Sequence, residues 1–176
     1  IAVLLLMGCN ETHKAVEVGK DNGKGSNTAN KNTLTLEHNG LTREYVLFVP
    51  SNYNSTTAIP LMFNFHAFGG NASEYMTYAD MQSLAESENF ILVYPQGSNL
   101  DGSPHWNTCP NGGDNKSDAD DFGFIAALVN ELSTNYSVDK DRIYATGYSN
   151  GGMIAYGLAN YKSETFAAVA SVSGTM

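Results

Sequence analysis

A serine between glycines, at the end of a predicted strand, has the clearest chemical use of any pattern in this chain. Residues 147–151 read Gly-Tyr-Ser-Asn-Gly, between an apolar run at 142–146 that favours a strand and one at 152–161 that favours a helix. At such a junction a serine sits on a sharp turn, with its hydroxyl projecting from the end of a sheet. The glycines let the neighbouring backbone approach where a Cβ would not fit. Ser149 is therefore the candidate nucleophile.

A second pattern lies upstream and could stabilise the charge that such a serine creates. Residues 59–65 have a buried-strand pattern and lead into residues 66–70, which read His-Ala-Phe-Gly-Gly. Attack on a carbonyl produces a tetrahedral oxyanion, which needs two preorganised N–H donors. One donor comes from the residue after the nucleophile, here Asn150, and the other from a loop after an earlier strand. We expect the second donor to be Phe68, with Ala67 as the alternative.

Together with further motifs, these patterns resemble the α/β-hydrolase superfamily, and within it the secreted esterases called polyhydroxybutyrate depolymerase or feruloyl esterase. The resemblance covers roughly residues 34–176. It rests on residues 66–70, Tyr94-Pro95-Gln96-Gly97, Trp106-Asn107, residues 120–124 and residues 144–153. The family usually has glycine at the position of Ala67. The resemblance implies an α/β-hydrolase fold and hydrolysis of carboxylic esters through an acyl-enzyme, without a cofactor.

The resemblance also implies two catalytic residues that this chain does not contain. In the superfamily the triad runs along the chain as Ser, then Asp or Glu, then His. No Asp and no His follows Ser149, so we expect the acid and the base beyond residue 176, in the missing C-terminal part of the domain. Among the histidines, His13 and His38 are expected on the surface. His66 is expected to brace the oxyanion loop, and His105 is the remaining alternative for the base.

Alternating strands and helices predict an α/β architecture over residues 33–176. Two segments around Asn39-Gly40, at 33–36 and 43–49, predict an antiparallel hairpin. Strands are then expected at 59–65, 90–94, 142–146 and 166–174, and helices at 73–88, 122–136 and 152–161. Strands that alternate with helices need right-handed crossovers, and therefore a mostly parallel sheet.

The long loop predicted at 95–117 leaves a strand at the end of the sheet where ligands bind. Trp106 in this loop could stack on an aromatic or sugar substrate, or anchor the loop to the domain. Tyr148 could line the pocket or pack under the turn, and His66 is a third candidate for substrate contact. No His and Cys pairs have metal-ligand spacing. Four aspartates could form a calcium loop, but we expect them to cap the following helix. They are Asp114, Asp118, Asp120 and Asp121.

The N-terminal residues predict export. Residues 1–9 resemble the end of a signal peptide, and Leu-Met-Gly-Cys resembles a bacterial lipobox with Cys9 as the lipidated residue. Ordinary secretory cleavage is the alternative. Residues 10–32 are polar without apolar periodicity, which predicts a flexible tether. Lipidation of Cys9 would leave Cys109 to pair outside this sequence or to remain a buried free thiol.

Composition narrows the class of partner. The 176 residues are 42% hydrophobic and carry a formal net charge of −9, with a pI near 4.7. Phosphate contacts need a basic face, so the acidic charge argues against nucleic acid as a partner, and membrane contact is expected only through the lipid anchor. The expected substrate is an ester, polymeric in the case of a polyhydroxyalkanoate or a plant polysaccharide ester. The alternatives are a serine peptidase of the same fold and a non-catalytic surface binding module.

Overall fold

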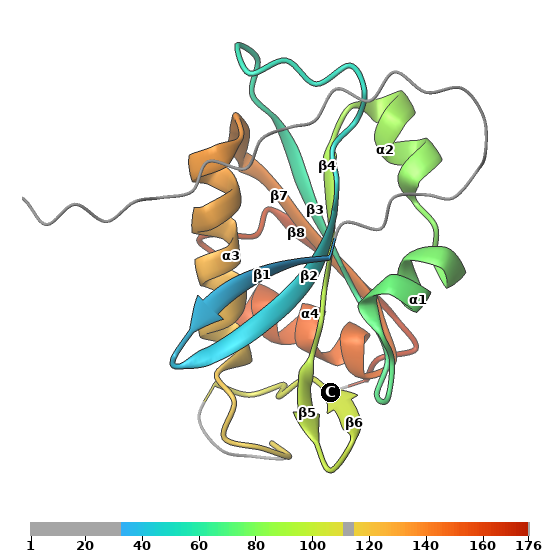
Figure 1. Cartoon of the computed structure of the whole chain (residues 1–176), viewed down its shortest axis with the longest axis vertical. Coiled ribbons are helices and arrows are strands. Elements are labelled where there is room, and N and C mark those ends of the chain that lie inside the picture. The colour runs from blue at the N-terminus through green and yellow to red at the C-terminus, as the bar shows by residue number, and fades with distance from the viewer. Residues whose placement is uncertain (1–32, 111–114, 176) are drawn as a thin grey trace, which may run out of the picture.

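The computed structural model describes residues 33–110 and 115–175, and its centre is a six-stranded sheet (Figure 1). The strand order is β1-β2-β4-β3-β7-β8, and a separate hairpin is formed by β5 and β6. The strands are β1 (Thr33–His38), β2 (Leu41–Phe48), β3 (Ile59–Phe65), β4 (Ile91–Pro95), β5 (Ser98–Leu100), β6 (Ser103–His105), β7 (Val138–Tyr148) and β8 (Ala168–Val172). The helices are α1 (Ala72–Tyr78), α2 (Gln82–Glu88), α3 (Asp121–Asn135) and α4 (Asn150–Tyr161).

The direction of the strands confirms the predicted fold class. The pairs β1–β2 and β2–β4 are antiparallel, whereas β4, β3, β7 and β8 pair in parallel. The N-terminal hairpin turns at Asn39 and Gly40, both with positive φ, as its Asn-Gly sequence predicted. Because the parallel strands run the same way, their carboxyl ends lie at one edge of the sheet.

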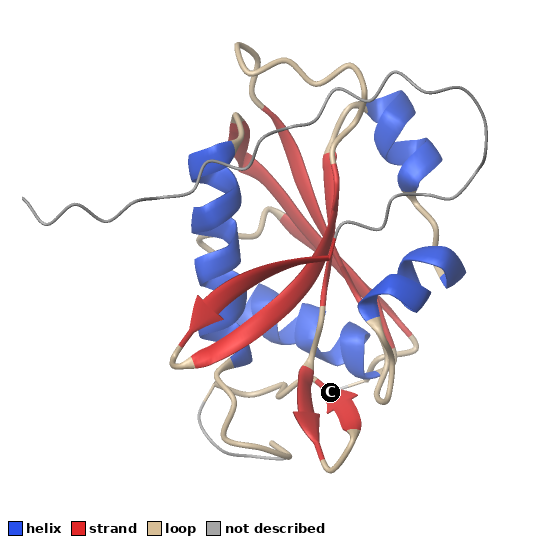
Figure 2. Ribbon diagram, in the orientation of Figure 1, coloured by secondary structure: helices blue, strands red, loops and turns tan. Residues whose placement is uncertain are grey.

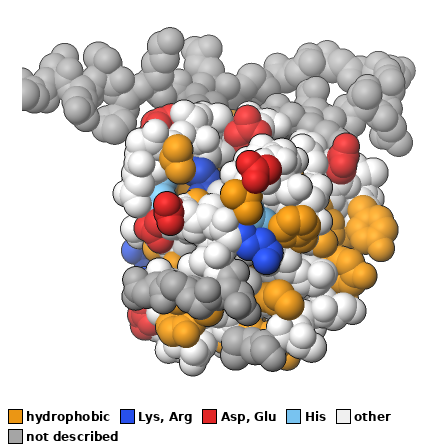
Figure 3. Space-filling view, turned by 90° about the horizontal axis from the view of Figure 1, so that it is seen from below, with side chains coloured by type: hydrophobic (Ala, Val, Ile, Leu, Met, Phe, Trp, Pro, Cys, Tyr) orange, Lys and Arg blue, Asp and Glu red, His pale blue; other side chains and the backbone are white. Residues whose placement is uncertain are grey.

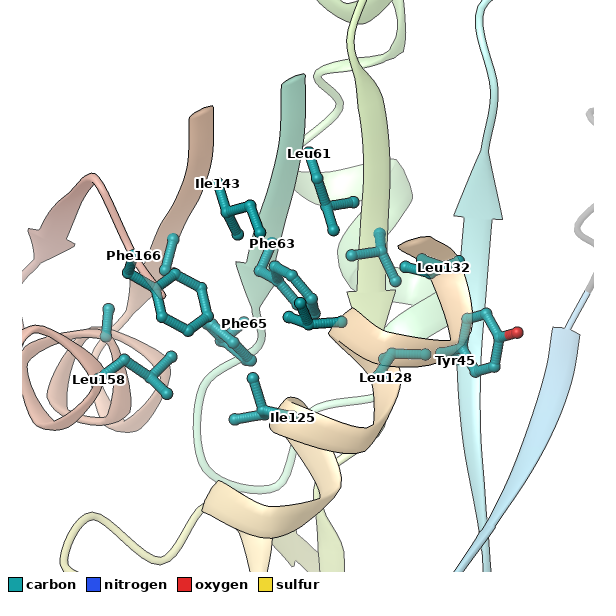
Figure 4. Close-up of a cluster of buried hydrophobic side chains, with 14 of the residues drawn as sticks. Tyr45, Leu61, Phe63, Phe65, Ile125, Leu128, Leu132, Ile143, Leu158 and Phe166 are labelled. Carbon is teal, nitrogen blue, oxygen red and sulfur yellow. The ribbon is translucent and has the colours of Figure 1, made fainter. Parts of the chain in front are cut away.

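Helices cover both faces of the sheet, α3 and α4 on one and α1 and α2 on the other (Figure 2). Successive side chains of a strand point to opposite faces, so β3 contributes to both cores. Leu61, Phe63 and Phe65 pack toward α3 and α4 in the larger core (Figure 4). Met62 packs against the smaller core under α1 and α2. Burial of these apolar side chains on two faces holds β3 at the centre.

The helix predicted at 73–88 is two short helices, α1 and α2, so that prediction was wrong. The break lies at residues 79–81, where the hydroxyl of Tyr94 donates to Ala79 O (2.7 Å) and accepts from Met81 N–H (3.2 Å). The backbone groups released by the break are thus bound by a buried tyrosine from β4. Tertiary structure, rather than helix propensity, sets the end of α1.

The segment at 95–117 was predicted to be a loop, but it contains the β5–β6 hairpin. The hairpin lies beyond the end of β4, at the carboxyl edge of the parallel strands (Figure 1). The other predicted elements are present, with ends shifted by a few residues. The predicted signal peptide at 1–9, the lipidation site Cys9 and the tether at 10–32 lie outside the described residues.

Two consecutive aspartates at the start of α3 have different roles. Asp120 is the N-cap residue, and its carboxylate accepts from Gly123 N–H (2.8 Å), which confirms the predicted capping. Asp121 instead lies in the interior and forms an ion pair with Arg43 (2.7 Å). Burial raises the pKa of Asp121, while Arg43 and the N–H of Asn107 act in the opposite direction. Of the other two aspartates, Asp114 lies outside the described residues.

Candidate active site

Ser149 occupies a strained turn between β7 and α4. Its φ of 53° and ψ of −117° lie in a region that residues with a Cβ rarely adopt. The Ser149 N–H donates to Val172 O of β8 (2.8 Å), and its carbonyl accepts from Met153 N–H (2.9 Å). A Cβ at Gly151 would overlap Phe65 O, so the glycine is required by close backbone packing. The turn holds Ser149 at the carboxyl edge of the sheet.

The loop that was predicted to complete an oxyanion site begins beside this turn. In the β3–β7 ladder Phe65 is paired with Gly147, so residues 66–70 and the serine turn leave the sheet at one level. Gly69 turns the loop with a φ of 73°, and its N–H donates to Pro104 O of β6 (2.6 Å). The Phe68 side chain is 49% exposed, and Ala67 is partly exposed. Asn150 opens α4, where N–H groups lack intrahelical partners.

His66 is buried, and both of its ring nitrogens are engaged. Nδ1 lies 2.7 Å from Ala67 O, and Nε2 accepts from Gly97 N–H (2.9 Å) and lies 3.1 Å from Gln96 Nε2. Burial lowers the pKa of His66 to about 4, so the ring is neutral at pH 7. With 1% of the residue exposed, the His66 side chain lies in the interior, and its contact with substrate stays a prediction. Its contacts agree with the bracing role.

Trp106 is also interior, and its stacking on substrate stays a prediction. It is 1% exposed and packs edge-on against Phe65, with ring centroids 5.1 Å apart. The indole N–H donates to His66 O (3.0 Å). The alternative interpretation, an anchor for the loop, therefore fits the structure.

Tyr148 is the one predicted substrate contact whose side chain reaches solvent, with 40% of the residue exposed. The hydroxyl of Tyr75, on α1, interacts with the Tyr148 backbone, and Tyr78 stacks on Tyr75 with ring centroids 6.3 Å apart. Figure 3 views the molecule from the end that carries the β5–β6 hairpin, and hydrophobic side chains gather on part of that face. Aromatic surface is thus available beside Ser149.

The other described histidines are held away from Ser149 by their own partners. His38 was predicted to be solvated, but its side chain is 16% exposed and lies 3.1 Å from an Asp120 oxygen. His105 is buried, with Nε2 3.0 Å from Ser117 Oγ. Within residues 33–110 and 115–175, no histidine forms a hydrogen bond with Ser149. His13 lies outside the described part of the chain.

Two residues that support this region, Gln96 and Asn107, belong to the sequence motifs, but the sequence did not indicate their roles. Gln96 accepts from Ala72 N–H (2.8 Å) with its side-chain oxygen and donates to Gly70 O (3.3 Å). Asn107 donates to Ser117 O and Ala119 O, both at 2.8 Å. Polar residues that follow a predicted strand were the available signal, but their partners are too distant in sequence to be inferred.

Cys109 is a free, partly exposed cysteine in this structure. In the described residues, no group of three or more His, Cys, Asp or Glu side chains is arranged to hold a metal ion. No described helix is long and apolar enough to cross a bilayer.

A strained serine between a strand and a helix, on a sheet of this strand order, defines an α/β-hydrolase. Residues 75–176 match the model of the prolyl oligopeptidase family. The chain belongs to this family.

Named relatives and a solved structure extend the comparison. Feruloyl esterase D of Neurospora crassa is 26% identical over 98% of this chain, and feruloyl esterase B of Thermothelomyces thermophilus is 30% identical over 73% of it. The solved acetyl xylan esterase from Aspergillus awamori is 26% identical over 76% of the chain, with a TM-score of 0.60. The chain spans 59%, 43% and 47% of the lengths of these three proteins.

Proposed function

We propose that this protein is a serine hydrolase that cleaves carboxylic esters through an acyl-enzyme. The observation that carries the proposal is the strained position of Ser149, beside the loop at 66–70 and at the edge of the sheet where ligands bind. Strain is retained in a fold where the surrounding structure enforces it, and it clusters at active sites.

In the proposed reaction Ser149 Oγ attacks the ester carbonyl and gives up its proton to a base. The carbonyl oxygen becomes an oxyanion, held by the N–H groups of Asn150 and Phe68, with the N–H of Ala67 as the alternative donor. Collapse of the tetrahedral intermediate breaks the bond to the alcohol, which leaves with a proton, and forms the acyl-enzyme. Water then attacks the acyl carbon, releases the acid and regenerates Ser149.

The base and the acid of the triad are proposed to lie outside the present sequence. This is supported by the described histidines, since His66 and His105 are buried in other hydrogen bonds and His38 is bonded to Asp120. Residues 1–176 expressed alone should therefore show little turnover. Robust Ser149-dependent hydrolysis by this segment would contradict the assignment.

The proposed substrates are feruloyl or acetyl esters of plant polysaccharides. Support comes from the names of the relatives and from the exposed aromatic surface near Ser149, which includes Tyr148 and Phe68. Polyhydroxyalkanoate is the other polymeric substrate implied by the sequence resemblance. Hydrolysis of methyl ferulate, p-nitrophenyl acetate and a 3-hydroxybutyrate oligomer, compared at equal concentration, would rank the three classes.

A serine peptidase of the same fold is the competing function, because the family includes enzymes named for peptide cleavage. The same serine turn can serve either reaction, and the two reactions differ in the leaving group, which is an alcohol for an ester and an amine for a peptide. The test compares an acyl p-nitrophenyl ester with the p-nitroanilide of the same acyl group, using the complete gene product and its Ser149→Ala variant. Ser149-dependent cleavage of the ester alone supports the esterase, whereas faster cleavage of the amide favours the peptidase. If the variant cleaves both substrates no more slowly than the parent protein, the cleavage does not depend on Ser149, which favours the non-catalytic binding module.

We further propose that the protein is exported and lipid-anchored through Cys9. The support is the lipobox-like sequence before it, which lies outside the described residues. Metabolic labelling with a palmitate analogue should mark the protein and fail in the Cys9→Ala variant. Release of an unlabelled protein into the medium would instead indicate ordinary secretion.

A further inference from the structure

The turn that carries Ser149 and the loop at 66–70 are linked through two buried side chains, those of Asn150 and Trp106. Asn150 Oδ1 accepts from Trp106 N–H (2.8 Å), and Asn150 Nδ2 donates to Trp106 O (3.0 Å). The two bonds pair a side-chain amide with both backbone groups of one residue, as a neighbouring strand would. We refer to this pair of hydrogen bonds as the Asn150 clamp.

Trp106 carries the connection onward to the loop. Its indole N–H donates to His66 O (3.0 Å), and its ring packs against Phe65 and His66 at centroid distances of 5.1 Å each. Trp106 thus contacts α4 through its backbone and the start of the loop through its side chain. A single buried residue links two segments that are about 80 positions apart in the chain.

His66 completes the link within the loop. Because Nε2 accepts from Gly97 N–H, the neutral ring carries its proton on Nδ1, which donates to Ala67 O (2.7 Å). The loop is also held from the hairpin, where Pro104 O accepts from Gly69 N–H. The peptide group before Phe68 is thus held by the His66 ring, which binds Gly97, and the peptide group after Phe68 is held by Pro104 of the hairpin.

We propose that the Asn150 side chain is a positioning residue, which sets the distance between its own N–H and that of Phe68 by clamping Trp106. The inference rests on the proposed function, since it concerns the oxyanion site of the same serine. Oxyanion stabilisation depends on donors that are already in place when the charge develops, so a small displacement of one donor lowers the rate without weakening substrate binding.

The test uses Asn150→Ala and Trp106→Phe in the complete gene product. Asn150→Ala keeps the backbone N–H and removes the clamp, while Trp106→Phe keeps an aromatic ring and removes the indole donor. The matched control is Asn135→Ala, on the exposed end of α3, where the amide binds only Glu131 of its own helix. Rates are divided by the number of active sites titrated with an organophosphonate, so that unfolded protein does not count.

We expect kcat per titrated site to fall by about 10- to 100-fold in each variant, within the range for a compromised oxyanion donor, with KM changed less than about threefold. A trifluoromethyl ketone, whose serine adduct places an oxygen at the oxyanion position, should lose affinity by the same factor as kcat/KM. The double variant should cost less than the product of the single effects, because both changes break one link. Asn135→Ala should behave as the parent.

Three outcomes would overturn the proposal. Variants with parental kcat per titrated site and only a lowered melting temperature would make the clamp purely structural. A fall in kcat with unchanged affinity for the trifluoromethyl ketone would place the defect elsewhere in the reaction. If the parent itself shows no Ser149-dependent hydrolysis, the proposed function fails and this inference fails with it, which separates that case from the first two.

Discussion

The serine turn and the loop at 66–70 follow neighbouring parallel strands, yet the residues with positive φ have different surroundings in the two. In the turn, Ser149 has a φ of 53°, and Gly151, two positions further on, has no room for a Cβ. In the loop, the positive φ belongs to Gly69, and a Cβ there would meet nothing within 4 Å. The turn is therefore closely packed at Gly151, whereas the loop has open space at Gly69 and is closely packed only at its last residue, Gly70, where a Cβ would lie 2.8 Å from Ala67 O.

The loop backbone is held by side chains, one from the loop itself and two from distant segments. His66, Gln96 and Trp106 hold its backbone by hydrogen bonds from the interior. A conformation held by packing depends on the size of its residues, while one held by buried polar contacts depends on their chemistry. The two regions should therefore respond to different substitutions.

The largest effect is expected at Ser149 itself. Ser149→Gly should lower the rate of ester hydrolysis by about 10⁴ to 10⁶, because the nucleophile is lost. The same change should raise the free energy of unfolding by about 1 kcal/mol, since glycine tolerates this backbone conformation. Kinetics and thermal unfolding of the complete gene product would measure both.

The control is Asn89→Gly, at the left-handed C-cap of α2, where φ is 54°. This change should leave the rate unaltered and the stability nearly so, because asparagine already tolerates that region. A loss of stability in Ser149→Gly would mean that the turn is not strained in the way its φ indicates.

The next effect compares two glycines, one from each region. Gly151→Ala should cost more than about 3 kcal/mol, because the new methyl would meet the Phe65 carbonyl oxygen, which is fixed in β3. Gly69→Ala should cost only about 1 kcal/mol, for the positive φ alone. Urea unfolding of the two variants checks the order, and equal costs would remove the distinction between the two regions.

The loop at 66–70 should also be more sensitive to acid than the serine turn. The folded pKa of His66 is lowered from 6.5 to about 4, so the unfolded chain takes up this proton first as the pH falls. Stability from His66 is therefore complete above pH 6.5 and is lost on descending to pH 4, up to about 3 kcal/mol. Below pH 4 both states are protonated and the loss stops.

Unfolding free energies measured between pH 4 and 7 would test this, with His66→Gln as the comparison. The variant lacks the titrating group, so its stability should fall less steeply over that interval. Parallel curves for parent and variant would show that His66 does not titrate as its burial requires.

The smallest effect is expected at the exposed apex of the loop. Phe68→Ala keeps the backbone N–H and removes a ring that is about half exposed, so stability should change by less than about 0.5 kcal/mol. The kcat of a small ester should stay within about threefold. A larger fall, with KM raised for aromatic esters only, would assign the Phe68 ring to the substrate pocket.

Much of the fold could be predicted because its signals are local. The Asn-Gly hairpin, the apolar run of β3 and the serine flanked by glycines each depend on neighbours a few residues apart. The break between α1 and α2 could not be predicted, since it depends on Tyr94, which lies more than ten residues beyond it. The burial of Trp106 is a similar case, because its partners lie about 40 residues away on either side.

The sequence by itself determined which residue is the candidate nucleophile and the order of strands and helices that presents it. The spacing of glycine and serine and the apolar periodicity are short-range properties, so they can be recognised in the sequence without knowledge of the fold. The tertiary structure alone decided that His66 and Trp106 are buried and form hydrogen bonds in the interior. Which side of a residue meets solvent depends on segments that only folding brings together, and hydrogen bonds such as those of the Asn150 clamp exist only there.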